Sequence, residues 1–241
     1  MRKFLLATIA LTGVLSAPAM ADSWVEVDDA PDGVPAAQHT DGTGPLTSIL
    51  GRLNRGAGDH VDTYSIIITD PAEFFATTKI DLGGSATTST GGNADTRLWL
   101  WTEQGAPVLA NDDINAFGSD TLASLISDPS TFPTLSGGEV VAPTAAQVSL
   151  TPGKYLISIS LFSNDPDDGV GEEVFNLGAD FDALHGPDPA AGPFAAWENP
   201  ASTTIASYTI ALRGATFCVP EPASASLLAI GLAALGLRRR S

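Results

Sequence analysis

The sequence predicts an all-β fold, an antiparallel β-sandwich, and three observations support this. Apolar and polar residues alternate in several short runs, the clearest of which are residues 64–68, 96–102, 154–162 and 208–213. A period of two is typical of strands that have one face in a core and the other in water. Clusters of Gly, Pro and Asp separate these runs. No long stretch has the period of a helix, so packed sheets are the expected architecture.

The order of elements along the chain follows from the same patterns. Strands are expected at residues 64–68, 73–82, 96–102, 107–110, 154–162 and 208–213, with a further short strand near 46–53. One short helix is expected at 121–126, capped by Ser119 or Asp120. Residues 165–200 are too long for a turn and form a candidate functional loop. The expected organisation is a leader at 1–21, an extended lead-in at 22–57, a sandwich at 58–218 and a C-terminal segment at 219–241.

The first 21 residues have the pattern of a secretory signal peptide. Arg2 and Lys3 precede an uncharged apolar run at residues 4–15, and Ala19 and Ala21 supply the small-x-small pattern that signal peptidase accepts. Cleavage after Ala21 would leave Asp22 as the new N-terminus. The alternative is an N-terminal membrane anchor, but the apolar run is shorter than the ~20 residues that a spanning helix needs. The sequence therefore predicts an exported protein.

The C-terminal segment combines three parts in a fixed order. Pro220-Glu221-Pro222 leads into an uncharged apolar stretch at residues 223–237, and three arginines follow at once. A basic cluster at the end of an apolar segment holds that end in the cytoplasm. The stretch is marginal as a permanent transmembrane helix, and transient insertion in the inner membrane suits it better. The alternative is a plain C-terminal anchor that happens to contain Pro-Glu-Pro.

These three parts resemble the PEP-CTERM protein-sorting signal. Proteins with this signal are substrates of exosortase, a transpeptidase-like membrane enzyme of Gram-negative bacteria that make exopolysaccharide. The resemblance implies a hydrophobic sorting helix that is processed during export, and a destination in the cell envelope, at the outer surface or in the extracellular matrix. It implies that the recognition residues are Pro220, Glu221, Pro222, Arg238, Arg239 and Arg240.

Charge narrows the classes of partner. The chain has a net charge of −17, and removal of both terminal segments leaves 6 basic against 27 acidic residues, a net charge of −21. Such a negative charge argues against binding to nucleic acid or anionic lipid and favours the binding of divalent cations. The alternative is that the acidic residues only form a solvated surface and bind no partner. Cys218 is the one cysteine, so no internal disulfide can form. This thiol lies beside the Pro-Glu-Pro motif, where it could pair between chains, meet the processing enzyme or be there by coincidence.

The central region contains a series of ordered pieces, among them Gly58-Asp59-His60-Val61-Asp62-Thr63-Tyr64-Ser65 and Thr151-Pro152-Gly153-Lys154-Tyr155. Over about residues 58–214 these pieces resemble bacterial pre-peptidase C-terminal (PPC-like) domains. The resemblance implies a jelly-roll-like sandwich that serves as a non-catalytic accessory module. Long inserts at 115–148 and 165–200 depart from the family pattern and put any site carried by loops in doubt.

Calcium is the metal that the acidic residues favour, because it takes several oxygen ligands from carboxylates held on loops. Strand ends are expected to bring a set of acidic and amide side chains to the same end of the sandwich. This set is Asp62, Asp95, Asn111, Asp112 and Asp113. Asp165, Asp167 and Asp168 form a second acidic loop. The alternative is that all of these side chains cap backbone N–H groups in turns.

Two tryptophans are candidates for binding sugars. Trp99 and Trp101 alternate with Leu98 and Leu100, so the two indole rings are expected on one strand face, ~7 Å apart. An exposed pair could stack on sugar rings of an exopolysaccharide. The alternative is that the lead-in or an insert covers both rings as a second small core.

No catalytic motif stands out. His39, His60 and His185 are scattered, and neither a zinc-binding helix motif nor a nucleophile elbow occurs. We therefore expect no enzyme but an exported surface or matrix protein that acts through binding or structure. The alternative is a secreted glycan-acting hydrolase that uses acidic loop residues.

Overall fold

The computed structural model describes residues 22–34, 36–89, 92–114, 122–133, 140–141, 149–178 and 180–218. The expected signal peptide with Ala19 and Ala21, and the C-terminal segment with its apolar stretch and arginines, lie outside the described residues. Among the residues that are described, no helix is long and apolar enough to cross a membrane.

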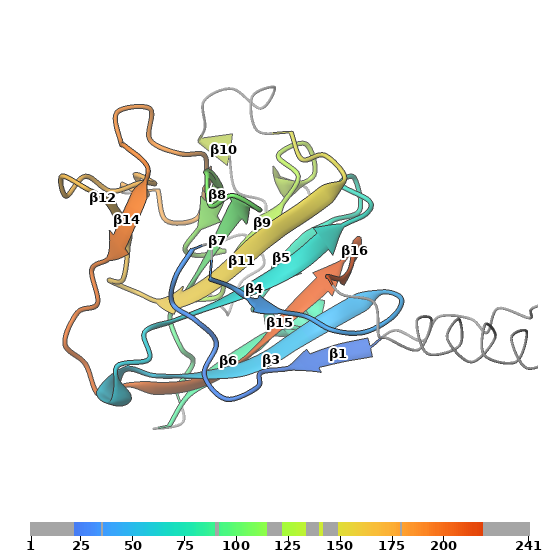
Figure 1. Ribbon diagram of the computed structural model, residues 1–241, viewed down its shortest axis with the longest axis horizontal. Coiled ribbons are helices and arrows are strands. Elements are labelled where there is room, and N and C mark those ends of the chain that lie inside the picture. The colour runs from blue at the N-terminus through green and yellow to red at the C-terminus, as the bar shows by residue number, and fades with distance from the viewer. Residues whose placement is uncertain are drawn as a thin grey trace, which may run out of the picture.

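Two sheets pack face to face (Figure 1). The first sheet has the strand order β1-β3-β15-β5-β9, and β6 also pairs with β15. Its strands are β1 (Asp22–Val25), β3 (Leu46–Asn54), β15 (Ile205–Arg213), β5 (Phe75–Thr77), β9 (Leu125–Ser127) and β6 (Ser85–Thr88).

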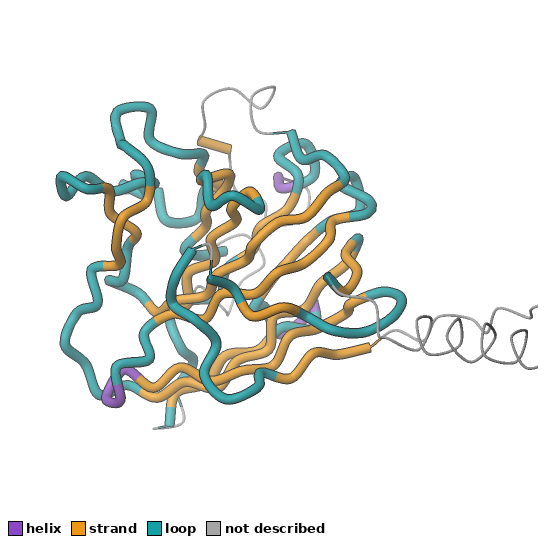
Figure 2. Tube along the Cα trace, viewed as in Figure 1, coloured by secondary structure: helices purple, strands orange, loops and turns teal. Residues whose placement is uncertain are grey.

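The second sheet has the strand order β10-β13-β8-β7-β11-β4-β16, and β2 also pairs with β4. Its strands are β10 (Val140–Val141), β13 (Leu184–His185), β8 (Pro107–Asn111), β7 (Thr96–Thr102), β11 (Gly153–Leu161), β4 (Val61–Ile68), β16 (Ala215–Phe217) and β2 (Gln38–His39). A separate ribbon joins β12 (Pro166–Asp168) to β14 (Phe194–Trp197). Two 3-10 turns, η1 (Arg55–Ala57) and η2 (Ile80–Leu82), are the named helical elements of the described chain, and strands and loops dominate it (Figure 2).

The alternation seen in the sequence builds the core between the sheets. Tyr64, Ile66 and Ile68 of β4 face inward, as do Tyr208 and Ile210 of β15, and all of them belong to one buried cluster. Because successive side chains of a strand point to opposite faces, the polar residues between them leave this core. The prediction of an all-β fold is confirmed.

The sheets are mixed, whereas the sequence analysis expected antiparallel ones. Three pairs of strands run parallel, β1 with β3, β2 with β4 and β10 with β13. Each pair includes a short strand that is not linked to its neighbour by a hairpin, and only a hairpin would force an antiparallel pair. Residues 22–57, expected as an extended lead-in, supply β1, β2 and β3. The last of these pairs with β15 through seven residues.

Two local expectations were wrong. The strand expected at 73–82 splits into β5 and η2, and Gly83, at a φ of 94°, ends η2. No helix occupies residues 122–126, where β9 begins at Leu125 and pairs with β5. All three residues of β9 are buried. A short run of buried residues has no alternation that would distinguish a strand from a helix.

Candidate metal centres and the covered tryptophans

The five residues predicted to bind calcium divide between two places. Asp62 lies with Glu26 and Asp29, whereas Asp95, Asp112 and Asp113 form a group of their own. In each group the three carboxylates offer one oxygen apiece within 4.8 Å of one another. The strands explain the division, because β11 separates β4 from β7 in the sheet, which places them about 10 Å apart. We call the two groups the Glu26 cluster and the Asp112 cluster.

Backbone contacts hold Glu26 in the first cluster. Its Oε1 accepts a hydrogen bond from Ala30 N at 3.0 Å, and its Oε2 accepts one from Arg52 N at 2.8 Å. The Glu26 N–H in turn donates to Leu50 O, which continues the pairing of β1 with β3. The carboxylate is therefore held by the turn after β1 and by the middle of β3.

Asp62 is the buried member of this cluster, with an exposed fraction of 0%. Its Oδ2 accepts a hydrogen bond from Tyr208 Oη at 2.6 Å, and Tyr208 Oη also lies 2.6 Å from Tyr64 Oη. Its Oδ1 has no hydrogen-bond partner. Burial, and then the nearby charge of Glu26, raise the pKa of Asp62 to about 10. A hydrogen bond to Glu26 also raises this pKa, so at neutral pH a proton on Asp62 joins the two carboxyl groups, and a bound cation would take the place of that proton.

Asp59 adds a fourth carboxylate beside the cluster. Its Oδ2 accepts a hydrogen bond from Asn54 N at 2.8 Å, and its Oδ1 has no partner. Burial, followed by the charges of Asp29 and Glu26, raises the pKa of Asp59 to about 7. None of the ion pairs found in the described part of the chain involves Glu26, Asp29, Asp59 or Asp62. The cluster therefore concentrates negative charge without a basic side chain to balance it.

The Asp112 cluster is built around an arginine. Arg97 Nη2 lies 2.8 Å from Asp112 Oδ2, Arg97 Nη1 pairs with Asp165, and the guanidinium lies 4.6 Å from the centroid of the Phe162 ring. Burial and then the charge of Asp112 raise the pKa of Asp95 to about 6, and the same two causes raise the pKa of Asp113 to about 7.

Asn111, the fifth residue predicted to bind calcium, is held by hydrogen bonds to the backbone. Its Nδ2 donates to Asp113 O at 3.0 Å and to Ala183 O at 2.8 Å, and its Oδ1 accepts from Leu125 N at 2.7 Å. The amide thus joins β8 to β9 and to the chain before β13, which is a structural role.

The second acidic loop follows the turn interpretation. Asp168 Oδ1 accepts hydrogen bonds from Val170 N and Glu172 N, and Asp168 Oδ2 accepts one from Gly192 N at 2.8 Å. These N–H groups, first that of Gly192, lower the pKa of the Asp168 carboxyl. Asp165 is the partner of Arg97, so the carboxylates of Asp165 and Asp168 both have partners within the protein, and for Asp167 the two interpretations stay open.

Trp99 and Trp101 are both fully buried, with exposed fractions of 0%. Residues of the 165–200 excursion cover them, above all Phe175 and Trp197, whose rings lie 5.3–6.0 Å from the two indoles. The indole N–H groups donate to Ser160 Oγ and Ser158 Oγ, each at 3.0 Å. The hypothesis of an exposed sugar platform is therefore wrong, and the other interpretation, a covered second core, describes the structure.

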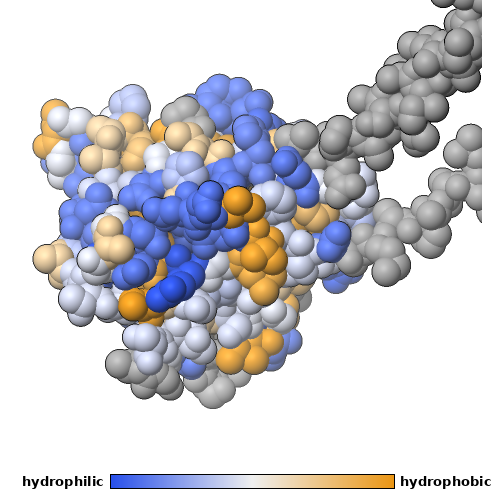
Figure 3. Space-filling model, turned by 60° about the horizontal axis from the view of Figure 1, so that its bottom comes forward, coloured by the Kyte–Doolittle hydropathy of each residue, from blue (hydrophilic) through white to orange (hydrophobic). Residues whose placement is uncertain are grey.

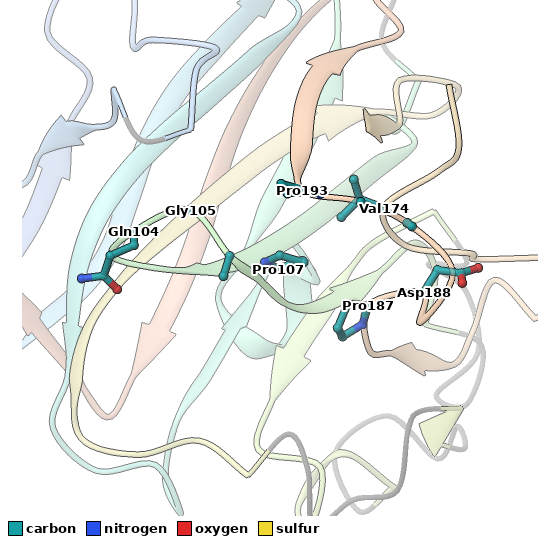
Figure 4. Close-up of a pocket in the computed structure, with 10 residues that line it drawn as sticks. Gln104, Gly105, Pro107, Val174, Pro187, Asp188 and Pro193 are labelled. Carbon is teal, nitrogen blue, oxygen red and sulfur yellow. The ribbon is translucent and has the colours of Figure 1, made fainter. Parts of the chain in front are cut away.

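A pocket of about 440 Å³ lies between the turn after β7 and the chain around residues 187–193 (Figure 4). Pro107, Pro187 and Pro193 form much of its wall, and Asp188 is its one charged lining residue. Neither acidic cluster contributes to this wall. On the face seen in Figure 3, apolar residues form separate patches among hydrophilic ones.

The Glu26 side of the site was missed by the sequence analysis. Glu26 and Asp29 lie in a segment assigned to an extended lead-in, and their distance of about 35 residues from Asp62 hides the contact. The acidic turn at residues 26–29, together with the Asp59–Asp62 spacing before a strand, was the available signal.

Comparison with known protein families matches residues 219–240 to the PEP-CTERM protein-sorting motif. No curated protein matches the chain. The motif marks an exported protein that an exosortase sorts to the cell envelope, as the C-terminal pattern predicts. The resemblance of residues 58–214 to PPC-like domains, the Gram-negative host and insertion in the membrane stay predictions.

Proposed function

We propose that the protein is a calcium-binding, non-catalytic component of the cell surface or extracellular matrix, delivered there through its sorting signal. The observation that carries the proposal is the Glu26 cluster. Carboxylates from the turn after β1 and from β4 converge there, and the buried Asp62 Oδ1 has no hydrogen-bond partner.

The residues fit calcium in kind and in spacing. Calcium takes six to eight oxygen ligands at about 2.3–2.6 Å, so the oxygens around one ion lie up to about 5 Å apart. Those of Glu26, Asp29 and Asp62 lie within 4.8 Å of one another. Asp59 contributes further negative charge. A bound ion would supply the positive charge that the cluster lacks and would join the N-terminal segment to β4.

The non-catalytic part of the proposal rests on where the acids lie. The 440 Å³ pocket has the single carboxylate of Asp188, whereas glycoside hydrolysis needs a pair across the scissile bond. Asp188 Oδ1 also accepts a hydrogen bond from Ala190 N at 2.7 Å. In the second acidic loop, Asp165 and Asp168 are held by Arg97 and by backbone N–H groups.

Titration calorimetry of the exported protein with calcium tests the binding. We expect Asp62→Asn to remove the ion bound at the Glu26 cluster, because the variant keeps the shape of the side chain and loses its charge. Asp41→Asn, which changes an exposed acid elsewhere, is the matched control and should bind as the wild type does. Equal calcium uptake by the wild type and Asp62→Asn would refute this site.

Mass spectrometry of the protein recovered from its host tests the delivery. Replacement of Pro220, Glu221 and Pro222 by alanine should leave a chain that retains its C-terminal segment, whereas Ser241→Ala should be processed normally. Normal processing of the triple variant would show that this motif is not what the sorting enzyme reads.

A further inference from the structure

We propose that the chain holds a second divalent cation, of the size of calcium, at the Asp112 cluster, with Asp95, Asp112 and Asp113 as its ligands. This inference goes beyond the proposed function, which rests on the Glu26 cluster alone. The two clusters share no residue.

Two strand ends bring the ligands together. Asp95 directly precedes β7, and Asp112 and Asp113 directly follow β8, its antiparallel neighbour, so the start of one strand meets the end of the other. Backbone contacts hold this end in place, because Asp95 O accepts from Phe162 N at 3.0 Å and Asp113 N donates to Phe181 O at 2.8 Å. One oxygen of each carboxylate then lies within 4.8 Å of the other two, a spread that bonds of about 2.3–2.6 Å can span.

Unpartnered oxygens point to a ligand. Asp112 has an exposed fraction of 1%, and its Oδ1 has no hydrogen-bond partner even though Oδ2 pairs with Arg97. Oδ1 atoms of Asp95 and Asp113 are also buried without a partner. Such acceptors cost free energy in a folded protein unless something binds them.

The charges leave room for one divalent ion. Four carboxylates meet here, those of Asp95, Asp112, Asp113 and Asp165. Two guanidinium groups oppose them. Arg97 pairs with Asp112 and Asp165. Arg55 lies close enough to Arg97 and Asp95 for their charges to act on the pKa of Arg55. Asp182 also lies close enough to act on Asp113, so carboxylates outnumber guanidinium groups at this corner and a divalent cation would offset part of the excess negative charge.

Arg97 is a positioning residue in this arrangement. Its side chain is buried, and it fixes Asp112 from one side and Asp165 from the other. Arg55 reinforces the same corner, since its Nη2 donates to Phe162 O at 2.9 Å. Arg55 Nε and Arg97 Nε have no partner either, so water molecules that bridge these donors to the carboxylates are the competing occupant.

Ion counting by titration calorimetry with calcium on the exported protein decides between them. We expect two calcium ions per chain for the wild type and for Asp41→Asn. Asp113→Asn and Asp62→Asn should each bind one ion, and the variant that combines these two substitutions should bind none. Asp113→Asn should weaken the ion at the Asp112 cluster at least tenfold, and Asp95→Asn should do the same. Asp113 and Asp95 are chosen over Asp112 because neither pairs directly with Arg97 in the described structure.

The outcomes separate the two sites. If Asp113→Asn and Asp95→Asn both fold, as judged by circular dichroism, and both bind as much calcium as the wild type, the Asp112 cluster is a hydrated ion-pair network and the inference is wrong. If those variants each lose one ion while Asp62→Asn loses none, the inference stands and the proposed Glu26 site fails. If either variant does not fold, terbium luminescence of the wild type and of Asp62→Asn counts the sites, and an Asp62→Asn protein that binds no terbium would overturn the inference.

Discussion

Replacement of the buried carboxyl group of Asp62 by an amide should stabilise the calcium-free protein, although it removes a proposed ligand. Asp62→Asn keeps the size of the side chain and leaves an amide oxygen that can accept the hydrogen bond from Tyr208. It takes away a carboxyl group that has an exposed fraction of 0% and no basic partner in the described structure. The sign of the effect therefore depends on whether calcium is present.

The magnitude follows from the pKa of this carboxyl group. Burial and Glu26 raise the pKa of Asp62 from its usual 3.8 to about 10, so at pH 7 the folded protein keeps a proton that the unfolded chain releases. The difference between pH 7 and 3.8 is about three units, and each unit corresponds to about 1.4 kcal/mol. The free energy of unfolding of the wild type is thus lowered by up to about 4 kcal/mol. Near pH 4 the cost shrinks to about 0.5 kcal/mol, because both states then hold much of the proton.

Thermal denaturation at pH 7 and pH 4, with a chelator and with calcium, measures the effect. Without calcium, Asp62→Asn should melt roughly 8–16 °C higher than the wild type at pH 7, since 1 kcal/mol shifts Tm by about 2–4 °C in a protein of this size. Calcium at a hundred times its Kd for this site should raise the free energy of unfolding of the wild type by about 2.7 kcal/mol. The variant should show no such gain.

A single result would refute the reasoning. If the chelated variant melts below the wild type at pH 7, the carboxyl group is not carrying a burial cost, and the Glu26 cluster is satisfied without an ion. Asp41→Asn under the same conditions shows how much a change of one surface charge contributes.

Three further predictions concern pH, the second core and close packing. Calcium affinity, measured by calorimetry, should fall from pH 8 to pH 6, because the pKa of Asp59 is raised to about 7 and that of Asp62 to about 10, so protons compete with the ion; an affinity independent of pH would contradict this. Trp101→Ala should cost about 3–5 kcal/mol in urea denaturation, because it empties a fully buried site; a loss below about 1 kcal/mol would mean that the ring is not covered in solution. Gly51→Ala should cost about 1–3 kcal/mol in the same assay, because its new methyl group would collide with the hydroxyl of Tyr208, whereas Gly33→Ala, which meets only ordinary contact, should be close to neutral.

The strands were predictable where local pattern and burial agree. Four predicted strands lie within observed ones to within one residue, those at 64–68, 96–102, 154–162 and 208–213. In each of them the two faces of the strand have different environments, so the residue types alternate. The prediction failed at β9, whose three buried residues are too few to show an alternation. It also failed to recognise β1 and β2, whose four and two residues are too short to show a period.

The sequence predicted that acidic residues at strand ends would form sites, but not which of these residues share a cluster. Asp95, Asp112 and Asp113 were correctly expected to meet, because they lie at the adjoining ends of neighbouring strands. Asp62 was assigned to the wrong group. Its side chain faces the space between the sheets with Tyr64, whereas Arg97 shares the other face of the second sheet with Trp99.

The sequence by itself determined the destination and the class of fold. A sorting motif is read as a linear order of residues, and the alternation of strands is a local property, so neither needs the folded chain. Only the tertiary structure decided that the excursion at 165–200 covers Trp99 and Trp101, and that the turn after β1 brings Glu26 to Asp62. Both contacts join residues more than 30 positions apart, and no local pattern encodes which distant segments pack together.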